Sequence, residues 1–225
     1  MTRWSGCYQR TDGHLVTGCH QPNDRAKFDQ VAKGDETKIA ILHRGVSTAF
    51  RVGLGGLTIG ELARDTGLSK SGLYAHFRSK QALQLEVLAQ ARTEFVDAVL
   101  RPALLAPRGE PRVRELFIRW RDNGRQRTPG CCLFVKALNE FEGQDGPVRD
   151  QLIADHRDLH ESVAQIFGTG ISEGQFRDDA DPTQLAFDLA GIMFAGYHWL
   201  PVMGSTATQE RTTTAFEALL ASVRR

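Results

Sequence analysis

This chain has few cysteines, few prolines and almost no excess of one charge sign. It has four cysteines and eight prolines among 225 residues, and 28 basic side chains against 27 acidic ones. Four cysteines are too few for a disulfide scaffold, so we expect reduced thiols in the cytoplasm. A net charge of +1 excludes a uniformly basic or acidic protein. With 41% hydrophobic residues, the sequence predicts an ordinary globular protein.

Long uninterrupted apolar runs are also missing. The longest candidate, from Leu185 to Met203, contains Asp188 and His198, which argues against a membrane span. The first ten residues lack the apolar core of a signal peptide, so export is not expected. No segment alternates apolar and polar residues as a half-buried strand does. These absences predict an all-α, cytoplasmic protein with no membrane partner.

The basic residues are concentrated in one segment. Residues 37–80 carry seven Lys and Arg residues against two acids, a local net charge of +5. The first 36 residues carry five charges of each sign, so residues 81–225 have a net charge of −4. A basic segment attached to an acidic body is typical of a module that binds a polyanion such as nucleic acid. A chance cluster on a solvated face is the alternative.

From residue 35 onward, apolar residues recur at three- and four-residue steps, as they do in amphipathic helices. A long helix is predicted to run from Ser79 past Val99. The other predicted helices cover residues 35–53, 59–66, 69–77, 112–123, 131–141, 147–167, 183–200 and 210–223. The helix at 183–200 is apolar on almost every side, so we expect it to be buried on several sides.

The segment 1–34 differs from the rest because its apolar residues show no period. Its Gly, Pro, Asn and Asp residues favour an irregular chain. We interpret it as a flexible leader whose removal costs little stability. It contains Cys7, His14, Cys19 and His20, whose spacing matches no common zinc site, so no metal is expected there.

Two short predicted helices are joined by a tight turn. A Thr-x-x-Glu capping box at Thr58 begins the first helix, Gly67 supplies the left-handed residue that ends it, and Ser69 caps the second. This arrangement has the spacing of a helix-turn-helix, whose second helix enters the DNA major groove. A three-helix packing unit without DNA contacts is the alternative. The predicted inward side chains are Ile59, Leu62, Ala63, Leu68, Leu73 and Phe77.

Residues 58–83 read TIGELARDTGLSKSGLYAHFRSKQAL. This string resembles the DNA-binding segment of TetR-family transcriptional regulators, which have Ile-Ala-x-x-x-Gly before Ser-x-x-x-Leu-Tyr-x-His-Phe-x-Ser-Lys-x-x-Leu. The one departure is Leu62, where the family more often has Ile. The rest of the chain is similar to that family only in kind, as an acidic helical body of suitable length.

The resemblance implies an all-α chain in two functional domains after the leader. Residues 35–80 are expected to form a three-helix DNA-binding domain, and a long helix links it to a ligand-binding and dimerisation domain at 81–225. The implied partners are double-stranded DNA with a pseudo-palindromic operator, a small-molecule effector and a second copy in a homodimer. Most members of the family are repressors. The residues expected to contact DNA are Thr58, Ser69, Lys70, Ser71, Gly72, Tyr74, His76 and Lys80.

Large aromatic residues of the body are candidates for an effector site, although such residues more often simply fill a core. Because the family holds its ligand among the corresponding helices, the resemblance implies a site lined by Phe117, Trp120, Phe134, Phe187, Phe194, His198 and Trp199. This lining favours an apolar or aromatic ligand with one or two hydrogen-bonding groups. No cofactor and no metal are expected.

Two further pairs of residues are less specific. Cys131 and Cys132 begin a predicted helix, where a thiol is either a small core residue or redox-sensitive. His156 and His160 are four residues apart, which is more typical of a solvated or pocket-lining face than of a metal site.

Two other classes of protein compete with a ligand-controlled regulator. One is an all-helical enzyme, but no catalytic triad string, Gly-rich phosphate loop or paired-carboxylate motif occurs. The other is a DNA-binding protein that needs no ligand, for which the long acidic body would be superfluous. We therefore expect a transcriptional regulator and not an enzyme.

Overall fold

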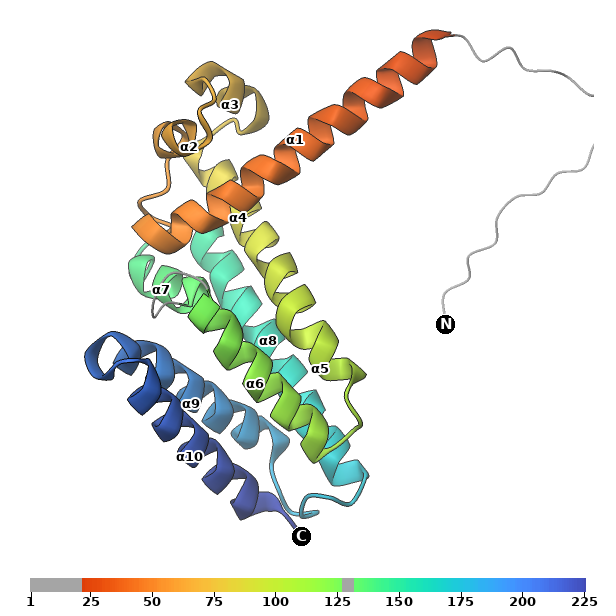
Figure 1. The fold of residues 1–225 in the computed structure, drawn as a ribbon, viewed down its shortest axis with the longest axis vertical. Helices are drawn as coiled ribbons and strands as arrows, with labels where there is room; N and C mark the ends of the chain where they lie inside the picture. The colour runs from red at the N-terminus through yellow and green to blue at the C-terminus, as the bar shows by residue number, and fades with distance from the viewer. Residues whose placement is uncertain (1–21, 127–131) are drawn as a thin grey trace, which may run out of the picture. The chain divides into compact units, whose positions relative to one another are not determined.

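The computed structural model describes residues 22–126 and 132–225, and within these ranges it is helical without a strand (Figure 1). An isolated bridge joins Phe176 to Arg224. The helices are α1 (Pro22–Val52), α2 (Ile59–Thr66), α3 (Lys70–His76), α4 (Lys80–Phe95), the π-helix η1 (Val96–Leu100), α5 (Arg101–Leu105), α6 (Glu110–Gln126), α7 (Leu133–Glu140), α8 (Pro147–Ser172), α9 (Pro182–Met203) and α10 (Ser205–Val223). The predicted all-α class is confirmed.

Helix α1 begins earlier than the sequence indicated. Its first residue is Pro22, so residues 22–34, which we assigned to the leader, are helical. Proline is well suited to the first helical position, because the amide hydrogen that it lacks has no partner there. Gly34 lowers helix propensity by only about 1 kcal/mol, which is too little to stop a helix. The remaining leader residues, with Cys7, His14, Cys19 and His20, lie outside the described residues.

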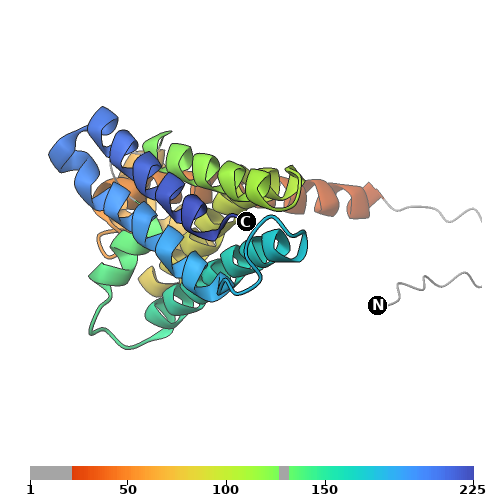
Figure 2. The same cartoon turned by 90° about the horizontal axis from the view of Figure 1, so that it is seen from below.

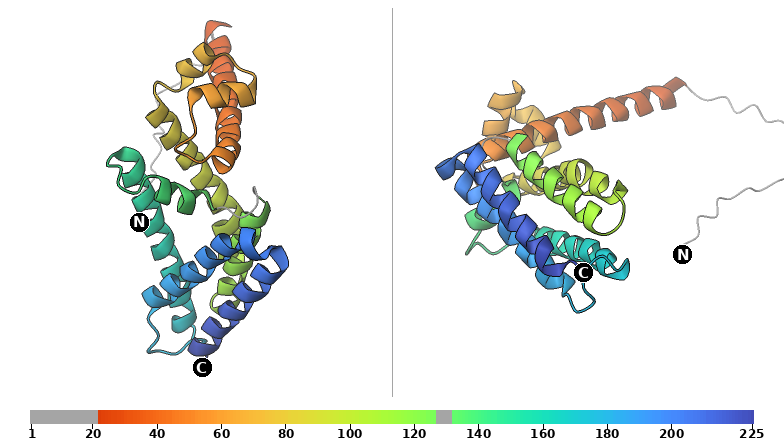
Figure 3. Two further views of the ribbon diagram at one scale, coloured as in Figure 1. Left: turned by 90° about the vertical axis from the view of Figure 1, so that its left-hand side faces the viewer. Right: turned by 60° about the horizontal axis from the view of Figure 1, so that its bottom comes forward.

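The chain forms two units, Met1–Thr37 and Lys38–Arg225. In the second unit, α2 and α3 lie at one end, and α9 and α10 lie side by side at the other (Figure 3). Helix α8 packs against α4, α6, α7 and α9, and Figure 2 shows it along one side of the helical body, next to α9. All further description concerns this second unit.

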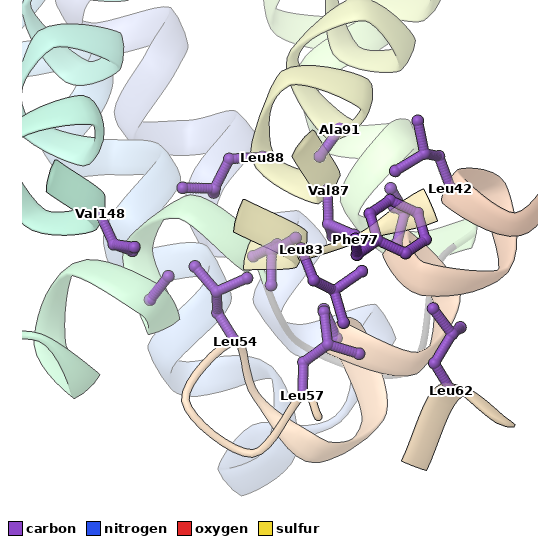
Figure 4. Packing of buried hydrophobic residues seen from close by; sticks show 14 of the residues in the cluster. Leu42, Leu54, Leu57, Leu62, Phe77, Leu83, Val87, Leu88, Ala91 and Val148 are labelled. Carbon is purple, nitrogen blue, oxygen red and sulfur yellow. The ribbon is translucent and has the colours of Figure 1, made fainter. Parts of the chain in front are cut away.

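Its buried residues form two clusters, and the division between them does not fall at residue 80. The first cluster joins the short helices α2 and α3 to α7 and the start of α8, and Figure 4 shows Phe77, Leu83 and Val87 meeting within it. The second cluster lies among η1, α5, α6, α8, α9 and α10. Because the first cluster includes Leu133 and Leu152, the core around α2 and α3 extends past residue 80 into α7 and α8.

Candidate functional site

The turn between α2 and α3 is built from local hydrogen bonds that the sequence predicts. Thr58 Oγ1 accepts the Glu61 amide at 3.0 Å, and Ser69 Oγ accepts the Gly72 amide at 3.1 Å. Gly67 ends α2 with φ of +69°, a left-handed conformation that favours glycine. These caps hold the two short helices in a helix-turn-helix arrangement.

The buried side of this unit is close to the prediction. Leu62, Leu73 and Phe77 are fully buried, and Ile59 and Ala63 are nearly so. Leu68 is the exception, because 41% of its surface is exposed. It lies in the turn just after Gly67, where the chain reverses and its side chain leaves the apolar face.

The outer face of α3 consists of small and polar side chains. Lys70, Ser71 and Gly72 are exposed, and Tyr74 is 56% exposed, so this face is open to a partner, whereas His76 is half-buried. Thr58 and Ser69 are exposed but already act as caps.

Lys80 lies at the start of α4, and Ser79 caps this helix by accepting the Ala82 amide at 3.0 Å. The Lys80 ammonium donates to the Gly55 carbonyl at 2.6 Å. It therefore holds the loop before α2, a contact that the sequence did not indicate.

Acidic side chains near this face are neutralised from within the chain. Arg51 donates to Asp65 at 2.6 Å, and Arg64 pairs with Glu61. The hydrogen bond from the Thr48 hydroxyl, and to a lesser extent that from Arg51, holds the pKa of the Asp65 carboxyl below its ordinary value. Lys70 and Arg78 form no ion pair among the described residues, so their positive charge is available to an anion such as a phosphate.

A continuous helical rod leads from this module into the body. Helices α4, η1 and α5 follow one another from Lys80 to Leu105 without a break, as the predicted long helix requires. The π-turn at Val96–Leu100 adds a wide turn within the rod. Insertions of this kind are frequent at functional sites.

A cavity of about 70 Å³ lies beside this π-turn. Its wall is contributed by α4, η1, α6, α7, α8 and α9. The lining residues are Arg92, Phe95, Val96, Leu100, Trp120, Cys132, Phe134, Val135, Asp155, His156, Asp158, Leu159, Ser162 and Phe194. Three of the predicted ligand residues, Trp120, Phe134 and Phe194, are brought together in it.

One wall of the cavity is an ion-pair cluster between α4 and α8. Arg92 donates to Asp155 at 2.7 Å and to Asp158 at 2.6 Å, and Gln151 donates to Asp155 at 3.0 Å. The hydrogen bonds that Arg92 donates to Asp158 and Asp155 raise the pKa of its guanidinium above the ordinary value. The buried Asp155 carboxylate is therefore paired, as a buried charge must be.

The sequence matches two family models. Residues 41–87 match the model described as bacterial regulatory proteins of the tetR family, and residues 109–216 match the tetracyclin repressor-like C-terminal domain. The chain belongs to the TetR family of transcriptional regulators. No match was found among proteins of curated function.

Several solved structures share this fold. A TetR regulator from Chloroflexus aurantiacus is 21% identical with a TM-score of 0.74, covering 86% of this chain and 98% of its own. The structure of AibR in complex with isovaleryl coenzyme A and operator DNA is 20% identical with a TM-score of 0.65, covering 81% and 97%. A regulator from Saccharomonospora viridis in complex with choline is 18% identical with a TM-score of 0.67, covering 85% and 99%.

Four of the ligand residues expected for this TetR regulator lie away from the cavity. Phe117 is 2% exposed and stacks on Phe216, with ring centroids 4.0 Å apart, so it belongs to the core. Phe187 and Trp199 lie on α9 and are 66% and 48% exposed. His198 is also exposed, and its ring contacts the Trp199 ring in a T-shaped arrangement. Apolar spacing identifies a residue on a packed face, but it does not identify what covers that face.

The sequence did not indicate most of the polar residues that line the cavity. Arg92, Asp155 and Asp158 were not among the predicted ligand residues. An acidic residue at a position that the helical period places on the apolar side of a long helix is nevertheless unusual, and it indicates a paired charge. His156 does line the cavity, and its ring Nδ1–H donates to the Leu152 carbonyl at 2.7 Å. Of the two cysteines, Cys132 is in the lining and Cys131 lies outside the described residues. No cluster suited to a metal ion occurs in the described part of the chain.

Helices α9 and α10 of the TetR regulator present an open apolar groove. Its volume is about 800 Å³, and its lining includes Phe187, Gly191, Ile192, Trp199 and Leu219. By length and composition alone, α9 is also apolar enough to cross a membrane, with a mean hydropathy of 1.2 over its best window. Only 22% of that window is buried within a single copy, so the expected burial of α9 on several sides requires a further partner for its apolar surface.

Proposed function

We propose that this TetR-family regulator is a homodimeric repressor that leaves a pseudo-palindromic operator when a small molecule enters the cavity. The observation that carries the proposal is the helical rod α4–η1–α5. Its first turn adjoins the helix-turn-helix, and Arg92, Phe95, Val96 and Leu100 of the same rod line the cavity. A change in the cavity therefore acts on an element that also supports the DNA-binding module.

The proposed DNA contacts use the exposed face of α3. Lys70 and Ser71 are suited to base edges in the major groove, while Tyr74 and Lys80 are suited to phosphates. Gly72 allows the helix to approach the DNA backbone closely. In a dimer, two copies of α3 would enter successive major grooves about 34–36 Å apart.

The α9–α10 groove supports the proposed dimer. Phe187 and Trp199 line this groove and are 66% and 48% exposed, and large apolar side chains gathered on one face are typical of an interface. An obligate homodimer of this type buries on the order of 2,000 Å² or more. We expect such a dimer in the cytoplasm, where chromosomal DNA is accessible.

The small volume of the cavity supports a conformational role for the ligand. Pockets that hold drug-sized ligands measure roughly 300–1,000 Å³, whereas this cavity measures about 70 Å³. A ligand larger than a few atoms must therefore displace the surrounding helices. Two relatives of this fold are described in complexes with isovaleryl coenzyme A and with choline, which supports a small-molecule effector without specifying which one.

A second connection joins the cavity to the DNA-binding module. Helix α7 is bounded at its start by Cys132, and Phe134 and Val135 of the same helix line the cavity. At its other end Glu140 Oε2 accepts the Gly55 amide at 2.8 Å. The Gly55 carbonyl is held by Lys80, so the loop before α2 is fixed on both sides.

The proposal is tested by footprinting the protein on the DNA that flanks its own gene. We expect two protected half-sites about one helical turn apart, and loss of protection when Lys70, Ser71 and Tyr74 are all changed to Ala. Addition of compounds from a thermal-shift screen should then release the DNA. Stable, sequence-independent binding that no stabilising compound weakens would contradict the proposal.

A further inference from the structure

The indole N–H of Trp120 is buried without an acceptor among the residues that the structure describes. Trp120 lies on α6, is 1% exposed and lines the cavity. Buried indole N–H groups normally donate a hydrogen bond, because a donor removed from water without a partner destabilises the folded state. An unsatisfied donor at the wall of a cavity therefore indicates an acceptor that the described residues do not supply.

The other polar side chains described around the cavity already have partners. Asp155 and Asp158 accept from Arg92, and His156 donates to the Leu152 carbonyl. Ser162 donates to the Asp158 carbonyl at 2.7 Å. The Trp120 N–H differs from these groups because it is an unused donor, so a ligand acceptor can bond to it without breaking an existing hydrogen bond.

The charge of the cavity wall favours a neutral molecule. The positive charge of Arg92 is shared between Asp155 and Asp158, so among the described lining residues a ligand carboxylate meets no unpaired Lys or Arg side chain and faces two like charges. The described charges leave a net charge of −1, but a ligand ammonium would gain little from it, because Asp155 already accepts from Arg92 and Gln151 and the Asp158 side chain is 52% exposed to solvent. Desolvating a charged ligand at such a site is unfavourable in either case.

The remaining wall is apolar. Phe95 packs its ring against Trp120 at 5.9 Å between centroids, with an interplanar angle of 83°. Val96, Leu100, Leu159 and Phe194 complete the surface around these two rings. A compact apolar body is therefore complementary to most of the lining.

We propose that the effector is a small, uncharged, apolar molecule with one hydrogen-bond acceptor, such as a ketone or ester carbonyl, and that Trp120 Nε1–H donates to that acceptor. This inference rests on the proposed function, because it assigns the ligand class of the same cavity. Trp120 is then a specificity-determining residue, which selects acceptor-bearing molecules over hydrocarbons of equal shape.

The experiment compares acetophenone with α-methylstyrene, which have the same shape but differ in a carbonyl oxygen and a methylene group. Each is titrated into full-length protein labelled with ¹⁵N, and the indole N–H signal of Trp120 is assigned from its loss in Trp120→Phe. We expect acetophenone to bind roughly 3- to 10-fold more tightly and to move the Trp120 indole proton downfield. The Trp120→Phe variant keeps the aromatic ring, so it should bind both probes with equal affinity.

Equal affinity of the wild-type protein for the two probes would overturn the inference, since an ordered water would then satisfy the indole. Failure of both probes to bind would also overturn it. The proposed function has a separate readout, which is release of operator DNA by any stabilising compound. If charged compounds release the DNA while neither probe binds, the ligand class is wrong and the repressor function stands.

Discussion

At the scale of single residues, the proposed DNA-binding face of α3 depends on a few exposed side chains that can contact DNA. Tyr74 is 56% exposed, and it shares α3 with the fully buried Leu73. The caps at Thr58 and Ser69 and the turn at Gly67 were predictable, because each depends on residues within three positions. The exposure of Leu68 was not predictable, since spacing alone places it on the apolar face.

The Tyr74→Phe variant tests the proposed phosphate contact. It removes one hydroxyl from an exposed ring, so the melting temperature should stay that of the wild type. Loss of one hydrogen bond to a charged group should weaken binding about tenfold, and equally for all operator variants because a phosphate carries no sequence information. Fluorescence anisotropy on a series of operator duplexes measures this. A loss confined to particular bases would assign Tyr74 to base recognition instead.

A second residue-scale prediction concerns acid stability. Hydrogen bonds from Arg224, and then from Arg114, lower the pKa of Glu110 to about 2. Because the folded-state pKa lies below the unfolded value, the stability from Glu110 is fully present above that unfolded value. It is then lost as the pH falls from about 4.5 toward about 2.

The Glu110→Gln variant should lack this loss. In urea unfolding measured across that pH range, the free energy of unfolding of the variant should fall by about 1 kcal/mol less than that of the wild type, after allowance for solvent screening. Parallel curves for the two proteins would show that the network at Glu110 does not stabilise the fold.

At the scale of elements, α7 and the rod α4–η1–α5 both extend from the cavity to the helix-turn-helix. The rod was predictable from its apolar stripe, but the π-turn at Val96–Leu100 was not, because no local residue signal specifies it. The role of α7 was also hidden, since the contact between Glu140 and Gly55 joins residues far apart in the sequence.

The Glu140→Leu variant tests the α7 connection. It leaves the Gly55 amide without its acceptor, so the loop before α2 loosens and operator affinity should fall roughly 5- to 10-fold. Glu140→Gln is the matched control, because its amide oxygen can still accept this hydrogen bond. Operator affinity by anisotropy distinguishes the two variants. Wild-type affinity in Glu140→Leu would show that this bond does not support the DNA-binding module.

At the scale of the whole molecule, the sequence predicted the all-α class and the helix-turn-helix but not the composition of the cavity. Trp120 and Phe117 both lie on the apolar side of α6, yet only Trp120 reaches the cavity, because Phe216 covers Phe117. That difference depends on how distant helices pack. The same holds for α9, whose apolar residues divide between the core and the open groove.

The groove predicts how the molecule assembles. Phe187→Glu and Trp199→Glu place charges on the proposed interface, so sedimentation at micromolar concentration should show monomer or unfolded chain in place of a dimer. Leu105→Glu is the control, since Leu105 is 84% exposed and lies outside the groove. A dimer that tolerates both groove substitutions would place the interface elsewhere.

The central claim is that the cavity and the operator are coupled, and thermodynamic linkage makes this coupling reciprocal. The direct measurement is calorimetric titration of the compound that most raises the Tm in a thermal-shift screen, without DNA and with saturating operator DNA. The account predicts that operator weakens ligand binding by roughly 5- to 150-fold, corresponding to about 1–3 kcal/mol of coupling. Equal ligand affinity with and without operator would contradict it.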